Sequence, residues 1–552
     1  MYNNGNLYIA HSENGPICLT GRMCNRHGLI AGATGTGKTV TLQVLAETFS
    51  QAGVPCFMAD MKGDLSGISQ VGKMNGFIEK RCAEFGLQNP EFQACPVRFY
   101  DVFGEQGFPM RTTVSTMGPQ LLSRLMGLND TQSGVLNIVF RIADDKQLLL
   151  IDLKDLRLML DFVGKNSSKF TTEYGNVSAA SIGAIQRAVI ELETQGGDKF
   201  FGEPAFNVTD LLDQENGKGV MSVLAADKLM LQPKLYSTFL LWLLTELYAT
   251  LPEVGDADLP KLVFFFDEAH MLFDDTSKAM QDKMEQVIRL IRSKGVGIYF
   301  ITQSPTDVPV DILGQLGNRV QHALRAYTPK DQKAVRTAAQ TFRTNPAFNT
   351  EEAISQLGTG EALVSVLDEK GIPTVVEKAK ILFPLSQIGA ITAGQRLDIQ
   401  NAAPARIQEY KTFFDRESAY EVLTEQNQQA EAAEEKRKAE KEAEKEAKEA
   451  EKARAKAEKE AEKARKEAEK AEKEAAKSKS KSSGWTRTIF GTLIGAVTGV
   501  LARQVGTAVS DSITGKKRKP VTAKEVAGKA AKSASTTVTR KVTNEVLKNI
   551  FK

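Results

Sequence analysis

One eight-residue segment, Gly32-Ala33-Thr34-Gly35-Thr36-Gly37-Lys38-Thr39, constrains this chain more than any other feature. It matches the pattern GxxxxGKT, whose glycines let backbone N–H groups turn inward around phosphate oxygens while the following helix adds its positive dipole end. In this pattern Lys38 reaches the β- and γ-phosphates and Thr39 binds Mg²⁺. An apolar run at 28–31 precedes the segment and helical spacing follows it at 40–46, as a strand–loop–helix unit requires. The segment therefore predicts a phosphate-binding loop, with ATP and Mg²⁺ as cofactors.

Composition bounds the class of protein. The 552 residues are 42% hydrophobic, which is ample for a large core, and the net charge of +3 gives no global signal for nucleic-acid binding, so any basic surface would be local. The five cysteines are odd in number and form no CxxC pair, which indicates ordinary thiols of a reducing compartment. Residues 1–6 lack the basic and apolar regions of a secretory signal. We therefore expect a cytoplasmic protein.

Strand-like and helix-like patterns alternate along the first four hundred residues. A strand is expected at 55–59, after the helix that follows the phosphate-binding loop, and Leu262–Phe266 is a continuous apolar run typical of a buried parallel strand. Further strands are expected at 297–301, 319–327, 361–367 and 374–379. Residues 111–250 look mostly helical and are too long for one crossover. The pattern predicts an α/β fold with a mainly parallel sheet and a helical insertion.

Two carboxylates follow the apolar run at 262–266. Asp267 and Glu268 would lie at the carboxyl edge of the sheet, where ligands bind in such folds. Asp267 would hold Mg²⁺ through water and Glu268 would orient or deprotonate the attacking water, because phosphoryl transfer needs mainly positioning and charge neutralisation. His270 either links this site to a moving element or is simply a packed side chain.

Polar residues also end two other strands. Gln303 follows the run at 297–301 and would lie between the γ-phosphate and the water, or would merely cap the strand. Asp60 ends the strand at 55–59 and would help to position the metal or the water, or would cap the turn at 61–64.

The order of these motifs resembles the HerA/FtsK superfamily of ring-forming DNA translocases within the RecA-like P-loop ATPases, and most of all the bacterial HerA-like helicase-domain proteins (YjgR-like). The resemblance covers about residues 5–425 and rests on the segments 25–39, 60–65, 266–270, 289–297 and 301–305. It implies a RecA-like P-loop NTPase fold, DNA as partner and a homo-oligomer, possibly a hexamer.

The same resemblance implies roles for single residues. Arg292 matches an arginine that reaches a neighbouring subunit's nucleotide, although a solvated helix-end cation is the simpler interpretation. Gln303 matches the polar sensor and Asp60 the acidic residue of the second strand. Archaeal HerA-like translocases carry an N-terminal β-barrel that helps to build the hexamer. Because the phosphate-binding loop here begins at Gly32, we expect no such barrel before it.

Two functions stay open on these grounds. The first is a Mg²⁺-dependent ATP hydrolase that moves along or remodels DNA as a translocase or helicase. The second is a nucleotide-switched binding or assembly protein without DNA translocation. Strong stimulation of the ATPase rate by DNA is expected only of the first.

The composition changes abruptly near residue 426. Residues 430–480 are almost entirely Ala, Glu, Lys and Arg, with Glu–Lys pairs at helical spacing, and predict a solvated single helix, an alanine coiled coil or disorder. At 489–502 an uncharged segment with glycines four apart favours packing on a partner helix over membrane association, because it is too short to span a bilayer. A basic cluster at 516–519 would contact DNA phosphates or be solvated.

These patterns predict seven parts. They are N-terminal strands at 1–25, the first part of a RecA-like core at 26–110, the helical insertion at 111–250, the second part of the core at 251–385, a C-terminal helical element at 386–425, the Ala/Glu/Lys-rich single helix or coiled coil at 426–482, and the apolar segment with the basic tail at 483–552.

Overall fold

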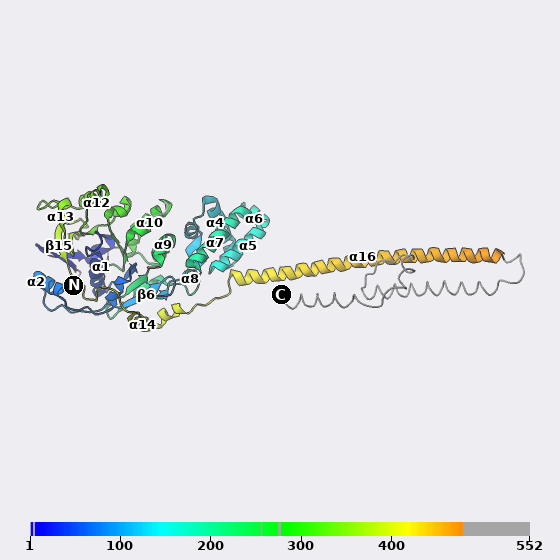
Figure 1. The fold of residues 1–552 in the computed structure, drawn as a ribbon, viewed down its shortest axis with the longest axis horizontal. Coiled ribbons are helices and arrows are strands. Elements are labelled where there is room, and N and C mark those ends of the chain that lie inside the picture. Colours follow the sequence, from blue (N-terminus) through cyan, green and yellow to red (C-terminus); the bar gives the residue numbers. More distant parts are fainter. Residues whose placement is uncertain (1, 4–5, 256, 274–277, 479–552) are drawn as a thin grey trace, which may run out of the picture. The chain divides into compact units, whose positions relative to one another are not determined.

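A computed structural model describes residues 2–3, 6–255, 257–273 and 278–478 of the chain. The chain forms two compact units, residues 1–434 and 435–552. The first unit is built around a thirteen-stranded sheet with helices on both faces (Figure 1). The predicted α/β fold is therefore confirmed.

The middle of the sheet is parallel. Its strand order is β13-β4-β12-β11-β5-β10-β6-β7, and every neighbouring pair in this run is parallel. The bounds are β4 Gly28–Ala31, β5 Cys56–Asp60, β6 Val97–Asp101, β7 Phe108–Pro109, β10 Met221–Ala225, β11 Leu262–Phe266, β12 Val296–Thr302 and β13 Asn318–Gln321. Because these strands point the same way, their carboxyl ends meet at one edge of the sheet.

Antiparallel strands extend the sheet beyond β13. The order outward is β14, β15, β2 and β1, and β3 pairs with β2. Their bounds are β1 Tyr2–Asn3, β2 Asn6–Ser12, β3 Gly15–Thr20, β14 Glu361–Ser365 and β15 Glu377–Ile381; a separate hairpin joins β8 Gln214–Glu215 to β9 Lys218–Gly219. The N-terminal strands expected at 1–25 thus belong to the central sheet.

Alternate side chains of the central strands face two different cores. Ile30 and Phe265 pack with α1 (Lys38–Gln51) on one face. Leu29 and Phe264 pack on the other face in the cluster that contains α9 (Pro233–Thr250) and α10 (Lys278–Ile291). Strands buried on both faces read as continuous apolar runs, which is why the pattern at 262–266 identified β11.

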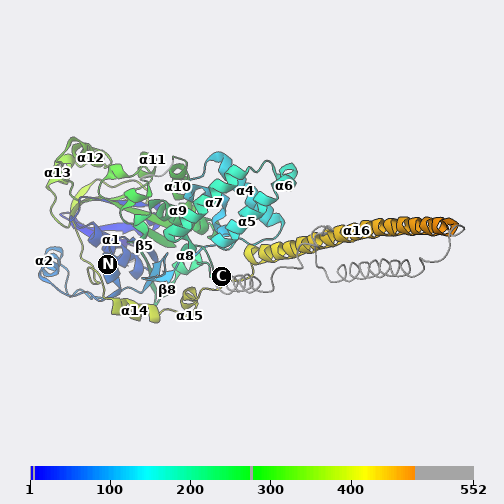
Figure 2. The ribbon, with the colours of Figure 1, turned by 45° about the vertical axis from the view of Figure 1, so that its right-hand side comes forward.

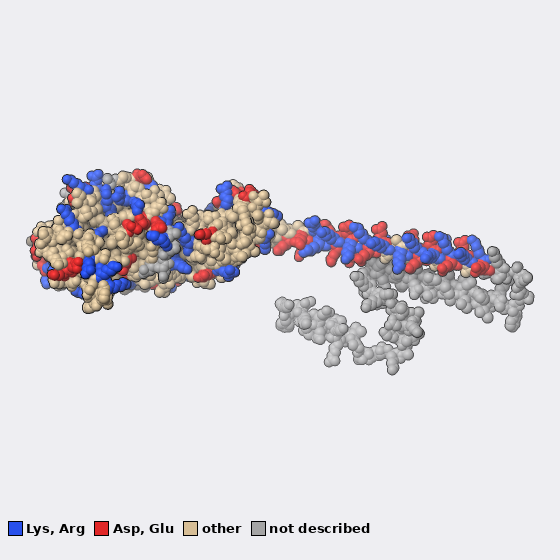
Figure 3. All heavy atoms as spheres, turned by 90° about the horizontal axis from the view of Figure 1, so that it is seen from above, with Lys and Arg blue, Asp and Glu red and all other residues tan. Residues whose placement is uncertain are grey.

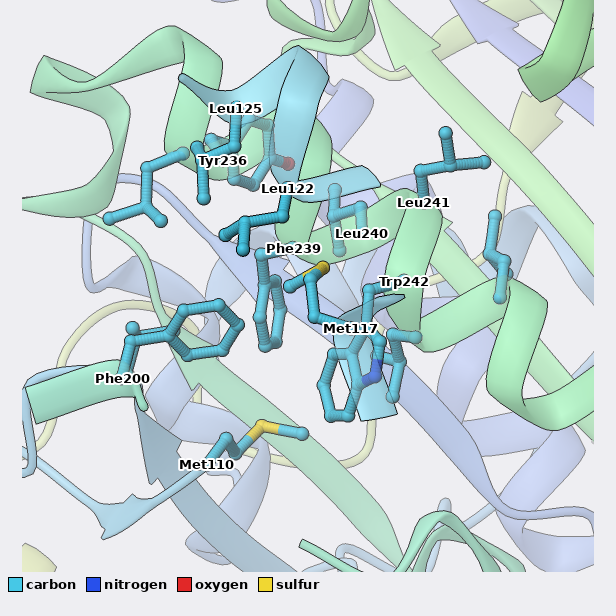
Figure 4. Packing of buried hydrophobic residues seen from close by; sticks show 14 of the residues in the cluster. Met110, Met117, Leu122, Leu125, Phe200, Tyr236, Phe239, Leu240, Leu241 and Trp242 are labelled. Carbon is cyan, nitrogen blue, oxygen red and sulfur yellow. The ribbon is translucent and has the colours of Figure 1, made fainter. Parts of the chain in front are cut away.

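A group of helices lies between β7 and β10 in the sequence. These are α3 Val114–Leu125, α4 Asp130–Asp145, α5 Leu153–Lys165, α6 Ser167–Tyr174, α7 Ala179–Leu192 and α8 Asp198–Phe200. Helices α4 to α7 lie together beside the sheet in both ribbon views (Figures 1 and 2). Figure 4 shows how Leu122 and Met117 of α3 pack against Phe239 and Trp242 of α9, so this group shares one apolar core with the sheet.

The structure differs from the sequence prediction within 111–250. This stretch was expected to be a helical insertion, but it contains β10, which pairs with β5 and β6 in the middle of the sheet, and α9, which packs on the sheet. The run Met221–Ala225 is a short, fully buried apolar segment, and hydrophobic periodicity cannot distinguish such a strand from a buried helical turn. Strand β13 also ends at Gln321, before the expected limit of 327.

The remaining helices flank the sheet and its C-terminal extension. They are α2 Gly76–Phe85, α11 Val310–Leu313, α12 Pro329–Gln340, α13 Thr350–Gln356, α14 Ala393–Asn401 and α15 Ala405–Gln408. The segment 382–418, here called the strap, carries α14 and α15. It begins beside α1, where Leu385 and Ser386 donate from their backbone N–H groups to Glu47, and it ends beside α5, where Ser418 donates to Asp155 over 2.5 Å.

The final described helix, α16, spans Ala419–Ser478 and therefore starts seven residues before the predicted limit of 426. Its first turn is anchored, because Ala419 and Leu423 are buried in the core that also contains α5. From residue 428 to 474 every side chain is exposed, and acidic and basic side chains alternate along the helix (Figure 3). Its interpretation as a single helix or as a coiled coil stays a prediction.

Among residues 2–3, 6–255, 257–273 and 278–478, no helix combines the length and the apolar character needed to cross a bilayer. The apolar segment predicted at 489–502 and the basic tail beyond it lie outside these residues.

Candidate nucleotide-binding site

The predicted phosphate-binding loop connects β4 to α1 at the carboxyl edge of the sheet. Gly37 has a φ of 112° and forms the N-cap of α1, a conformation that favours glycine because it has no Cβ. Gly32 is required for a different reason, since a Cβ there would lie 2.5 Å from the Cβ of His322. The loop is further held by a bond from the Ala33 N–H to the Ala323 carbonyl, at 2.8 Å. Thr34 and Gly35 are exposed, and Thr39 is half-buried in the first turn of α1.

Lys38 lies over the loop. Its Nζ donates to the carbonyls of Gly32 and Ala33, at 2.7 and 3.1 Å. Burial lowers the pKa of Lys38, although the nearby Glu268 and Asp267 oppose this shift. The ammonium thus sits among backbone acceptors that phosphate oxygens would replace.

Asp267 and Glu268 follow β11, two strands away from β4 with β12 between them. Both side chains are buried. Burial, followed by the charge of Glu268, raises the pKa of Asp267 to about 6. Glu268 has a φ of 46°, which is unusual for a residue with a side chain, and its N–H donates to Asp267 Oδ1 over 3.0 Å. A strained residue held in this way is typical of a functional site.

Glu268 contacts three side chains. Lys62, in the turn after β5, donates from Nζ to Glu268 Oε1 over 2.8 Å. Gln303, directly after β12, donates to Oε2 over 3.4 Å, and His270 Nδ1 lies 3.6 Å from the same oxygen. Burial raises the pKa of Glu268, but the bond from Lys62 and its charge, together with Gln303 and His270, outweigh this, so the net pKa is below the usual value. The structure therefore brings the predicted residues Glu268 and Gln303 together.

Sequence reasoning did not identify Lys62 as a functional residue, although it lies in the quoted segment 60–65. The available signal was a basic residue in the turn at the end of a parallel strand, next to Asp60. Only the pairing of β5 with β11 places this turn beside Glu268.

Asp60 is buried at the end of β5. Its Oδ1 accepts from the N–H groups of Gly63 and Lys62, at 2.8 and 3.3 Å, and so it caps the turn that carries Lys62. Burial, and then the nearby Asp64, raise the pKa of Asp60 to about 7. A role in metal binding stays a prediction for Asp60, and the turn-capping alternative is what these hydrogen bonds describe.

Arg292 does not join the other predicted residues. It is exposed and precedes β12, at the amino edge of the parallel strands, whereas the loop and Gln303 lie at the carboxyl edge. At ~3.3 Å per residue, the seven residues of β12 separate the two edges by roughly 20 Å. Arg292 lines a cavity of about 670 Å³ together with Arg26 and Arg289.

A buried histidine, His322, contacts the helix that follows the phosphate-binding loop. The Nε2 of His322 lies 2.8 Å from Thr41 Oγ1 in α1, and its Nδ1 lies 2.9 Å from the Glu361 carbonyl. Burial lowers the pKa of His322 to about 4, so the ring is neutral at pH 7. Within the described residues no cluster of three or more His, Cys, Asp or Glu side chains suits a metal ion.

A glycine-rich loop at a helix N-terminus, a lysine folded over it and two buried carboxylates at the same sheet edge define the class of P-loop NTPases. A model of the family "Helicase HerA-like C-terminal" matches residues 6–503. The chain belongs to this family, which confirms the predicted resemblance.

A search of curated proteins found no match to the sequence. Similar solved structures include the bacterial conjugative coupling protein TrwBdeltaN70, with 16% identity over 71% of this chain and 92% of that chain and a TM-score of 0.46. VirB4 of Thermoanaerobacter pseudethanolicus has 15% identity over 69% of this chain and 97% of its own, with a TM-score of 0.45. The complex of TrwB with ADP and Mg²⁺ has 16% identity over 68% and 91%, with a TM-score of 0.44.

Proposed function

We propose that the protein is a Mg²⁺-dependent ATPase that couples ATP hydrolysis to movement along DNA or to its remodelling. The observation that carries this proposal is the meeting of Lys38, Asp267 and Glu268 at one sheet edge. Lys38 belongs to the loop at the start of α1, whereas Asp267 and Glu268 follow β11, so the loop lies between these two carboxylates and the β13 side of the sheet.

The loop and the first turn of α1 would bind the triphosphate. Their backbone N–H groups would donate to phosphate oxygens, and the Lys38 ammonium would move from the Gly32 and Ala33 carbonyls to the β- and γ-phosphates. Thr39 and Asp267 would hold Mg²⁺, which when bound neutralises phosphate charge. Asp267 fits this role because burial and Glu268 disfavour its own negative charge, which a divalent cation would compensate.

Glu268 would orient and deprotonate the attacking water. The Lys62 contact keeps its carboxylate charged and fixed, and Gln303 holds the second oxygen near the same place. The Lys62 side chain is more than half exposed, so its ammonium would be free to follow negative charge arriving on the γ-phosphate while Glu268 turns to the water. Gln303 would contact that phosphate and so couple its presence to the position of β12.

Arg292 would act on a neighbouring subunit. Since it lies at the amino edge of its own sheet, it is separated from its own loop by the length of β12. The cavity of about 670 Å³ that Arg292 lines also contains Arg26 and Arg289 together with Glu285 and Asp311, and Arg289 is paired with Glu285. Arg292 itself would therefore supply the positive charge for a second copy's triphosphate. This proposal requires a homo-oligomer, for which a hexameric ring is one possible form.

The proposal of DNA as partner is supported by membership of the helicase HerA-like C-terminal family. The test is a steady-state ATPase measurement on the full chain with no DNA, single-stranded DNA and double-stranded DNA, together with native mass measurement. Strong stimulation by either DNA form in an oligomeric protein supports the proposal. ATP hydrolysis that DNA leaves unchanged would contradict coupling to DNA, and the absence of ATP binding would contradict the ATPase itself.

A second candidate, a nucleotide-switched assembly protein, is favoured by one observation. The strap is fixed to α1, the helix of the phosphate-binding loop, through Glu47 at its start, and it leads into α16 at its end. A shift of α1 on nucleotide binding would therefore act directly on the strap. Nucleotide-dependent assembly without DNA stimulation would distinguish this candidate from the first.

A further inference from the structure

The strand order of the sheet determines toward which side of the loop the nucleoside of a bound nucleotide would extend. Counting from β4, the carboxylates of β11 and the turn after β5 all lie on the β12 side. The γ-phosphate must be near Glu268, so the α-phosphate and the nucleoside attached to it point to the opposite side, toward β13 and β14. Because β14 runs antiparallel to β13, the turn that precedes β14 lies at the same edge as the loop.

That turn is bonded to the phosphate-binding loop on one side and to α2 on the other. The Gly360 N–H donates to the Thr36 carbonyl over 2.9 Å, and Gly37 is so close that a Cβ there would lie 3.3 Å from the Gly360 nitrogen. From the other side, Arg81 Nη2 donates to the Gly360 carbonyl over 3.2 Å. A Cβ on Gly360 would lie 3.8 Å from Cζ of Phe77. Phe77 is therefore adjacent to the turn that borders the loop.

The Phe77 ring is held in place and yet exposed. The Arg81 guanidinium lies 5.0 Å from its centroid and 5.6 Å from that of Phe85, which stacks on His11 at 4.9 Å. Arg81 is only 5% exposed, and its Nη1 lies 3.7 Å from Glu84 Oε2, which fixes the guanidinium further. Phe77, the outermost ring of this stack, is 51% exposed. A fixed aromatic ring on a cationic support is a stacking surface for another flat ring.

We infer that Phe77, supported by Arg81, is the platform on which the base of the bound nucleoside triphosphate stacks. This inference rests on the proposed function, since it takes the loop as the phosphate site. The ligand class is a purine nucleotide, because a purine offers the larger surface for stacking on Phe77.

The experiment compares ATP with inorganic tripolyphosphate, which carries the phosphates without a base. Dissociation constants are measured on the full chain for wild type, Phe77→Ala, Phe77→Tyr and the control Met74→Ala, whose side chain is an exposed apolar neighbour of the same segment. We expect Phe77→Ala to weaken ATP binding roughly tenfold or more, as loss of one base–aromatic stack does. Tripolyphosphate binding should be unchanged, which also shows that the variant is folded. Phe77→Tyr and Met74→Ala should bind ATP like wild type.

Two results would overturn the inference while leaving the ATPase intact. One is ATP binding by Phe77→Ala equal to wild type. The other is an equal loss for Phe77→Ala and Met74→Ala accompanied by a lower oligomer mass, which would identify the surface as a contact with a second copy. A wild-type protein that binds neither ATP nor tripolyphosphate would overturn the proposed function, and the inference with it.

Discussion

The Lys62 ammonium lies 2.8 Å from Glu268 Oε1, although 206 positions separate these residues in the sequence. Lys62 projects from the turn after β5, and Glu268 follows β11, the neighbouring strand. The contact gives a buried carboxylate with strained backbone a fixed position and a pKa below its usual value. The contact therefore favours the charged form of the Glu268 carboxylate.

The first prediction concerns this contact. Lys62→Met should lower kcat for ATP by roughly 10²-fold, because it removes a positive charge that fixes Glu268 beside the reacting phosphate. Lys62→Arg should retain part of the activity. The control is Lys73→Met, a change at an exposed lysine of the loop before α2. Steady-state kinetics with an unchanged or higher kcat for Lys62→Met would show instead that Lys62 restrains Glu268.

Glu268→Gln should bind ATP but hydrolyse it roughly 10²- to 10⁴-fold more slowly, because the amide keeps the shape of the side chain and loses the base. Lys38→Ala should differ by weakening nucleotide binding itself, since it removes the charge over the loop. Equilibrium binding and single-turnover hydrolysis separate the two effects. Near wild-type turnover of Glu268→Gln would contradict the catalytic assignment.

Arg292→Ala should reduce turnover roughly 10³-fold or more while leaving ATP binding intact, as loss of an arginine supplied in trans does. Mixing Arg292→Ala with Lys38→Ala subunits should restore part of the activity, because some interfaces would then combine an intact loop with an intact arginine. Arg336→Ala, at an exposed position of α12, serves as the control. A strict monomer whose specific ATPase activity is independent of concentration would disprove the trans role.

The stability of the strap's attachment to α1 should depend on pH because of Glu47. Burial raises the pKa of Glu47 from 4.5 to about 7, despite the hydrogen bonds that it accepts from Ser386 and Leu385. Between these two values the folded state binds more protons than the unfolded state, so this contribution to stability is largest below 4.5 and falls as pH rises through about 7.

Hydrogen–deuterium exchange of residues 382–392 measures this effect. Protection of wild type relative to Glu47→Gln, compared at equal pH, should fall as pH rises through about 7, because the glutamine does not titrate. A difference between the two proteins that is constant across this range would show that Glu47 does not titrate within it.

Truncation should separate α16 from the ATPase core. Deleting residues 426–552 should leave the basal ATPase rate and the core melting temperature nearly unchanged, because every side chain from residue 428 to 474 is exposed. Salt-sensitive DNA binding should decrease, since the deletion removes the basic cluster at 516–519. Deleting residues 418–552 should in addition lower the melting temperature, because it removes the buried Ala419 and Leu423. Loss of basal activity in the shorter deletion would contradict this division.

The sequence by itself determined the parts of the site that lie in single local patterns. The loop from Gly32 to Thr39 is recognisable because its glycines are needed by the backbone of that segment alone. Asp267 and Glu268 are recognisable because a strand buried on both faces leaves a continuous apolar run in front of them. The order of these segments was also sufficient to identify the family, and alternating strand and helix patterns were sufficient for the α/β class.

Other features were decided only by the tertiary structure. The run Met221–Ala225 became a strand rather than part of a helical insertion because β5 and β6 leave a gap between them that it fills, and no local pattern records that gap. Lys62 faces Glu268, and Arg81 reaches the Gly360 carbonyl, because distant segments end at the same edge of the sheet. Local periodicity encodes which face of an element is buried, whereas the partners of a polar side chain depend on which strands pair, and that is fixed only when the whole sheet assembles.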